Sequence, residues 1–102
     1  MKTIDYLNAV RASRNLKSDA KLADALDLTA SAVSAYRKGK THMGDDTALK
    51  VAEILGIEPY EVLADCHAER AETPSTAEAW RTLADRLRGP KSAALMLKLC
   101  VM

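Results

Sequence analysis

The 102-residue sequence contains no phenylalanine, and its aromatic residues are three tyrosines and one tryptophan. Glycine and proline are also scarce, with four and three residues. Strands draw on aromatic and β-branched residues, whereas this chain takes most of its apolar content from alanine and leucine, which favour helices. We therefore expect an all-α protein, with no central β-sheet.

Cysteine is almost absent, and Cys66 and Cys100 are far apart in the chain, with no CxxC pair. Neither His42 nor His67 has companion ligands at metal-binding spacing. A disulfide framework and a zinc motif are thereby excluded, so we expect no metal site and free thiols in a reducing cytoplasm.

Membrane and export signals are missing too. The N-terminal residues lack the apolar core of a signal peptide. The apolar segment at residues 94–102 is much shorter than the roughly 20 residues that span a bilayer. A regulator lying on a membrane surface stays as a minor alternative that rests on this segment alone.

Catalytic motifs are not found. The sequence has no glycine-rich phosphate loop, no GxSxG and no HExxH. The neighbouring carboxylates Asp45 and Asp46 are typical of a helix start. We therefore expect no enzyme, no cofactor and no small-molecule substrate.

The net charge of +1 does not by itself indicate a nucleic-acid partner. Its distribution does, because residues 1–50 hold nine Lys/Arg against six Asp/Glu (+3), whereas residues 51–102 hold six against eight (−2). This basic excess in the N-terminal half predicts a moderate, salt-sensitive attraction to phosphate.

Apolar spacing and capping residues predict five helices over residues 3–70. In chain order we expect helix 3–15 capped by Thr3, helix 18–26 capped by Ser18, helix 30–38 capped by Thr29 and ended by Gly39, a helix capped by Asp45 or Asp46 and ended by Gly56, and a helix starting at Pro59.

A break at residues 71–76 divides this unit, 1–70, from a helical extension, 71–102. Ser75 and Glu78 have the spacing of a capping box that opens a sixth helix, which Gly89-Pro90 ends. The apolar stripe of that helix is formed by Trp80, Leu83, Ala84 and Leu87. Either the stripe folds back on the bundle or it pairs with a second copy, and we favour a homodimer.

The most informative segment is residues 19–40, whose spacing describes two short helices meeting at a corner. Leu22, Ala23 and Leu26 share one face of the first helix, and Val33 and Tyr36 continue the inward face in the second. The turn between them requires a left-handed backbone at Asp27, a conformation that aspartate tolerates. The second helix has a thin polar outer face and a basic end, which suit the major groove of DNA.

This segment resembles the helix-turn-helix of the Cro and lambda-repressor-like (XRE-type) family, with Leu22, Ala23, Val33 and Tyr36 in its core positions. Residues 49–63, LKVAEILGIEPYEVL, are similar to the helix pair that follows in that family. The resemblance implies a five-helix lambda-repressor-like bundle and a sequence-specific DNA-binding transcriptional regulator, such as a small phage or prophage repressor.

The sequence departs from the family at two positions. Asp27 stands where glycine is usual, and Asp19 opens the first corner helix where a glutamine often donates to a phosphate. A carboxylate at residue 19 repels phosphate, although it also stabilises the N-terminus of a helix.

By position, the resemblance puts Ala30, Ser31 and Ala35 against base edges and the residues around the helix end against phosphates. None of the three can form a bidentate contact with a base, so we expect shallow readout supplemented by DNA shape. The complete expected DNA-binding set is Lys17, Thr29, Ala30, Ser31, Ser34, Ala35, Arg37, Lys38, Lys40 and Thr41.

A dimer would place two copies of helix 30–38 in successive major grooves of an operator, about 34–36 Å apart. The alternative is a protein-interaction module, antitoxin-like or scaffolding, whose helix-turn-helix has lost DNA readout. Its working surface would be the Trp80 stripe.

Overall fold

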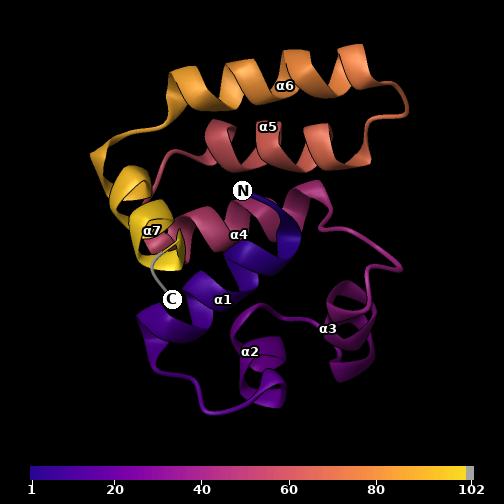
Figure 1. The fold of residues 1–102 in the computed structure, drawn as a ribbon. Coiled ribbons are helices and arrows are strands. Elements are labelled where there is room, and N and C mark those ends of the chain that lie inside the picture. Colours follow the sequence, from indigo (N-terminus) through magenta and orange to yellow (C-terminus); the bar gives the residue numbers. More distant parts are fainter. Residues whose placement is uncertain (101–102) are drawn as a thin grey trace.

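The computed structural model describes residues 1–100, without the side chains of Met96 and of residues 98–100. This part of the chain is all-helical, as the sequence predicts, and contains no strand (Figure 1). The helices are α1 (Thr3–Arg14), α2 (Asp19–Ala25), α3 (Ala30–Arg37), α4 (Asp45–Leu55), α5 (Pro59–Arg70), α6 (Pro74–Leu87) and α7 (Pro90–Cys100).

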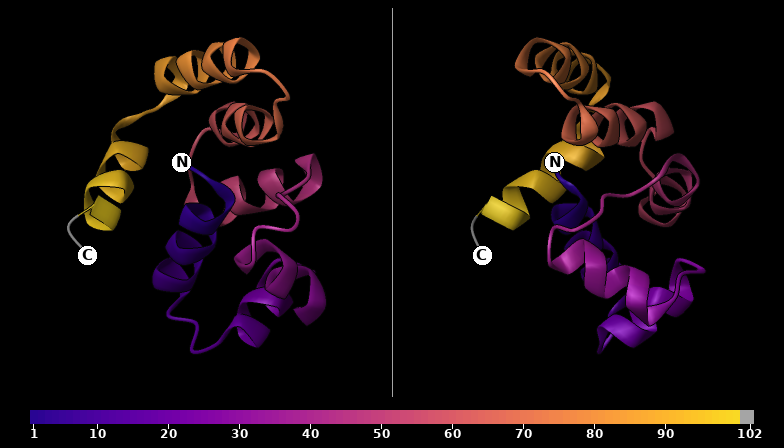
Figure 2. Two further views of the ribbon diagram at one scale, coloured as in Figure 1. Left: turned by 45° about the vertical axis from the view of Figure 1, so that its right-hand side comes forward. Right: turned by 90° about the vertical axis from the view of Figure 1, so that its right-hand side faces the viewer.

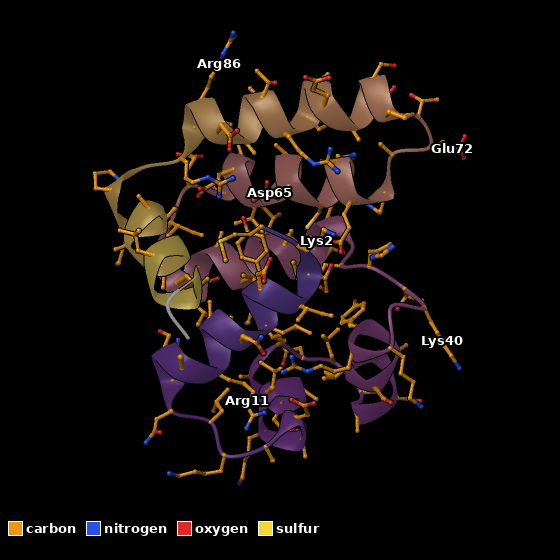
Figure 3. All side chains as sticks on the ribbon, in the orientation of Figure 1. Lys2, Arg11, Lys40, Asp65, Glu72 and Arg86 are labelled. Carbon is orange, nitrogen blue, oxygen red and sulfur yellow. The ribbon has the colours of Figure 1, made fainter. Side chains whose placement is uncertain are left out.

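The helices are arranged so that the corner motif and the extension occupy opposite ends of the molecule. Figures 1 and 2 show α2 and α3 at one end, α1 and α4 in the middle, and α5 between α4 and α6. Helix α7 returns to lie beside α1. In Figure 3, Lys40 extends outward after α3, while Arg86 extends outward from α6 at the other end.

The core is built around α1, whose Tyr6, Leu7 and Val10 are completely buried. Their neighbours come from α2, α3, α4, α5 and the α3–α4 loop, and together they form one cluster. Removing such side chains from water is the main favourable term in folding. The fully buried members of that cluster are Tyr6, Leu7, Val10, Leu22, Val33, Met43, Ala48, Val51 and Val62.

Several predicted helix ends are confirmed. Ser18 Oγ accepts from the Lys21 amide at 3.2 Å, and Thr29 Oγ1 accepts from the Ala32 amide at 3.0 Å. Gly56 ends α4 in the left-handed conformation, with φ 66°. Pro59 occupies the first position of α5, where its missing amide hydrogen is not needed.

Two predicted caps are wrong, at the starts of α1 and α4. The N-cap of α1 is Lys2, and Thr3 is buried with its hydroxyl bonded to Glu69. Neither Asp45 nor Asp46 caps α4, since Gly44 takes that position.

The expected capping box at the start of α6 is also absent. Thr73 caps this helix by accepting from the Thr76 amide at 3.3 Å, and Pro74 is its first residue. The prediction placed the cap two residues late, because Ser75 has Glu78 three residues later, as a capping box requires, whereas Thr73 has Thr76. Local patterns locate a helix start only to within one or two residues.

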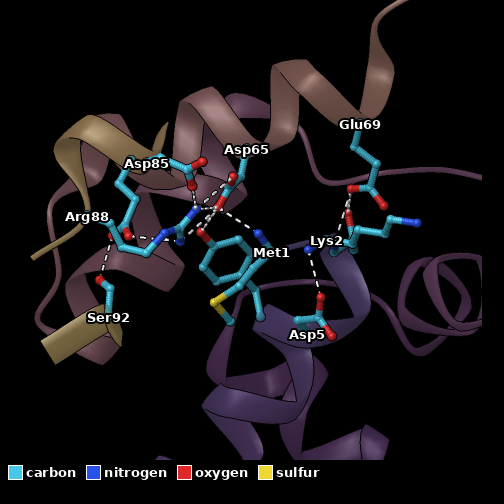
Figure 4. A network of polar contacts seen from close by, with 11 residues as sticks. Met1, Lys2, Asp5, Asp65, Glu69, Asp85, Arg88 and Ser92 are labelled. Carbon is cyan, nitrogen blue, oxygen red and sulfur yellow. Dashed lines mark hydrogen bonds and ion pairs between the residues drawn. The ribbon is translucent and has the colours of Figure 1, made fainter. Parts of the chain in front are cut away.

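A buried polar cluster joins the extension to the bundle (Figure 4). Arg88 donates to Glu61 at 3.0 Å and to Asp65 at 3.3 Å, and Ser92 donates to Glu61 at 2.6 Å. The Tyr6 hydroxyl donates to Asp65 from α1. Burial raises the pKa of Glu61, while the bond from Ser92 and the charge of Arg88 act to lower it.

Replacing Arg88 by methionine leaves two carboxylates without their buried guanidinium. Breaking one side of a buried ion pair costs about 3–5 kcal/mol, so Arg88→Met should lower the free energy of unfolding by about that amount. Urea denaturation measures the change, and Arg86→Met, on the exposed side of α6, is the matched control. Equal stability of the two variants would contradict a structural role for the cluster.

Candidate nucleic-acid interface

The corner between α2 and α3 is set by one left-handed residue. Asp27 has φ 55°, as the sequence predicts, and the Leu28 amide donates to the Ala23 carbonyl at 2.8 Å to close the turn. Ala23 is only 3% exposed, which fits its expected core position. The turn thereby fixes where α3 leaves the bundle.

Helix α3 keeps one face in the core and exposes the other. Val33 and Tyr36 are buried, which confirms the prediction that Tyr36 belongs to the core. The expected contact residues Thr29, Ala30, Ser31 and Ser34 are exposed, and Ala35 is half-buried. The outer face of this short helix therefore presents methyl groups and hydroxyls, and no other described part of the chain covers it.

Basic residues follow α3 directly. Gly39 turns the chain with φ 74°, and Lys38, Lys40 and Thr41 are exposed around it. Lys17 is exposed in the α1–α2 loop, two residues before Asp19. In the part of the chain that the structure describes, no carboxylate lies within ion-pair distance of Lys17, Lys38 or Lys40. These ammonium groups are available to phosphate.

Arg37, by contrast, turns back to the bundle. Its Nε and Nη2 donate to the two carboxylate oxygens of Asp19 at 3.2 and 3.1 Å, and its Nη1 donates to Asn8 Oδ1 at 2.6 Å. Arg11 adds a bond to Asp19 at 3.3 Å. The hydrogen bond from Arg37 is the largest influence that holds the pKa of Asp19 below its usual value.

Comparison with known families agrees with this geometry. A family model described as helix-turn-helix matches residues 7–62, more than half of the 102 residues. The chain belongs to the XRE-type helix-turn-helix family of DNA-binding regulators. A second model, described as phage related protein, matches residues 63–101. No curated protein and no solved structure matches the chain.

In this helix-turn-helix protein, the apolar stripe of α6 is partly used within the chain. The Trp80 ring stacks on His67 with centroids 4.7 Å apart, and Ala84 is completely buried. Leu87 is half-buried, whereas Leu83 remains 42% exposed. Folding back therefore accounts for Trp80 and Ala84. Dimerisation through the stripe stays a prediction.

Other reactive side chains have structural surroundings. Cys66 is buried, and burial raises the pKa of its thiol to about 12, so the nucleophilic thiolate is scarce at neutral pH. Among the side chains that the structure describes, no three histidine, cysteine, aspartate or glutamate residues are placed to hold a metal ion. No helix within residues 1–100 has the length and apolar content needed to cross a membrane.

Sequence reasoning did not find the polar contacts behind α3. Asn8 and Arg11 were not singled out, because they lie on α1 and meet Asp19 and Arg37 only after three helices pack. The unusual carboxylate at residue 19 was the one available signal. Asp19 marks the place of these polar contacts, although the residues that bond to it cannot be inferred from sequence spacing.

The left-handed turn gives a test of how α3 is oriented. A Cβ atom is unfavourable at positive φ, so Asp27→Ala should be about 1 kcal/mol less stable than Asp27→Gly in thermal or urea unfolding. Both variants lose the exposed Lys50 contact, so their difference isolates the backbone effect. Asp24→Ala, within α2, controls for loss of a surface carboxylate. Equal stability of the alanine and glycine variants would argue against the left-handed turn.

Proposed function

We propose that this protein is a phage- or prophage-type repressor that binds an operator in double-stranded DNA as a homodimer, within the cytoplasm. The observation that carries the proposal is the exposed outer face of α3, followed at once by Lys38 and Lys40, which have no ion-pair partner among the described residues. Residues 1–70 would be the DNA-binding unit, and 71–102 the extension with the dimer contact. Bound over a promoter, the dimer would exclude RNA polymerase.

In this proposal α3 enters the major groove, which is wide enough to admit a helix. Ser31 and Ser34 each offer one hydroxyl to base edges, while the methyl groups of Ala30 and Ala35 pack on thymine. Since single hydroxyls discriminate weakly, sequence-dependent DNA shape supplies part of the specificity.

Phosphate contacts hold the helix in register. Lys38, Lys40 and Thr41 follow α3 and would lie along one strand, whereas Lys17 approaches from the α1–α2 loop. Thr29 stands at the N-terminus of α3, where backbone amides and the helix dipole favour a phosphate.

The position of α6 bears on the dimer. Because α6 and α3 lie at opposite ends of a molecule 36 Å long, pairing through the exposed flank of α6 would hold the two α3 helices far apart. Such a dimer requires half-sites separated by more than one helical turn of about 34–36 Å. Half-sites one turn apart would place the dimer contact elsewhere.

Selection of binding sites from random duplex DNA tests the function directly, followed by gel shifts at low and moderate salt. A repressor should enrich one palindromic site that saturates and survives moderate salt. Several strictly required G·C pairs in each half-site would contradict shallow readout. Weak, uniform binding that vanishes with salt would favour the interaction module instead.

A carboxylate on the outer face of α3 should weaken DNA binding without unfolding the protein. Ser34→Glu places a negative charge on exposed α3, so affinity for the selected duplex should fall about tenfold or more. Ser13→Glu, at an exposed position of α1 on the side that faces α7, is the matched control and should bind normally. Gel shifts measure affinity, and circular dichroism confirms that both variants are folded. Unchanged binding by Ser34→Glu would remove α3 from the interface.

The lysines after α3 should contribute through phosphate alone. Lys38→Ala or Lys40→Ala should weaken binding to all duplexes alike and flatten the plot of log K against log salt by about one unit per contact. Fluorescence anisotropy between low and moderate salt gives the slope. Lys21→Ala, exposed on α2, serves as the charge-matched control. A slope unaffected by either substitution would exclude that lysine.

A further inference from the structure

We propose that Arg37 positions α3 for DNA reading and does not bind phosphate, because Asp19 holds its guanidinium against the bundle. This inference rests on the proposed DNA-binding function and revises the expected role of Arg37. It also gives Asp19 a structural role at the position where the family often has a glutamine that donates to a phosphate.

The geometry shows a fully engaged side chain. All three guanidinium nitrogens of Arg37 have hydrogen-bond partners. Nε and Nη2 donate to the two carboxylate oxygens of Asp19, and Nη1 donates to Asn8 Oδ1. Two parallel N–H···O bonds are the strongest arrangement that arginine forms with a carboxylate. For Arg37 to bind a phosphate, this bidentate pair would have to break.

Helix α3 needs such an anchor. It has eight residues, its buried side chains are Val33 and Tyr36, and its main helix contacts are with α1 and α2. A helix this short is not stable alone. Arg37 is its last residue and links it to α2 through Asp19 and to α1 through Asn8. The pair therefore adds a polar restraint on the tilt of α3 at its C-terminal end, beside the buried Tyr36.

The charges around the pair distinguish it from the lysines nearby. Asp19 also accepts from Arg11, so one carboxylate is shared by two guanidinium groups. Lys38, the next residue after Arg37, is exposed and has no ion-pair partner within the described chain. The two adjacent cations thus differ in role: Arg37 pairs with Asp19 within the protein, and Lys38 is available to a phosphate.

Two variants and one control separate positioning from phosphate binding. Arg37→Met removes the charge but keeps the length of the side chain, Asp19→Asn weakens the pair with an almost unchanged shape, and Lys38→Met is the control. Each is titrated with two probes, the duplex that the wild-type protein selects and a fixed duplex of random sequence, over a series of salt concentrations.

Positioning predicts that Arg37→Met and Asp19→Asn each reduce the preference for the selected duplex by about tenfold, and that the double variant loses no more than either alone. The salt slope on the random duplex should not become shallower. Lys38→Met should instead flatten the slope by about one unit and keep the preference. If Arg37→Met behaves like Lys38→Met, or changes neither quantity, the inference is overturned.

Amide hydrogen exchange tests the anchor without DNA. The Lys38 and Lys40 amides, which donate to Ser34 and Ala35 at 3.1 and 3.0 Å, should exchange faster in both pair variants, while the Leu28 amide in the turn keeps its rate. Unchanged exchange would refute positioning even if DNA binding were lost. A wild-type protein that prefers no duplex would refute the proposed function, whereas faster exchange would still support the anchor.

Discussion

The structure depends on the burial of one face of α1 beneath the other helices. Tyr6, Leu7 and Val10 have no exposed surface, and α1 contacts α2, α3, α4 and α7. Full burial of one such side chain contributes about 1.5–3 kcal/mol. Helices α2 and α3 have seven and eight residues and cannot persist alone. Helix α3 contributes little to the core. Its packing on α1 and α2 therefore holds its outer face in place.

The net charge of +1 conceals two different arrangements of charged residues, one buried and one at the surface. Glu61, Asp65 and Arg88 form a buried cluster in which each charge depends on the others. At the opposite end, Asp19 and Arg37 are paired near the surface, and α3 is followed by Lys38 and Lys40, which have no ion-pair partner in the part of the chain that the structure describes. Because the buried charges neutralise one another while lysines are exposed at the end that carries α3, a chain with a net charge of +1 has a basic surface at that end.

The extension is an integral part of the packing. Helix α6 covers α5, and Arg88, just after α6, reaches carboxylates on α5. Two family matches meet between residues 62 and 63, within α5, so that helix belongs to both matched segments. Helix α5 packs against both α4 and α6, and thereby connects the bundle to the extension.

The sequence by itself determined the helical class, most of the helix positions, the left-handed Asp27 and the inward faces of α2 and α3, because these follow from local spacing and backbone preference. It also identified the exposed face of α3. Only the tertiary structure decided which polar groups meet. Thr3 pairs with Glu69 across 66 residues, and Arg37 pairs with Asp19 across 18. Such partners depend on how the helices pack, which local sequence patterns do not reveal.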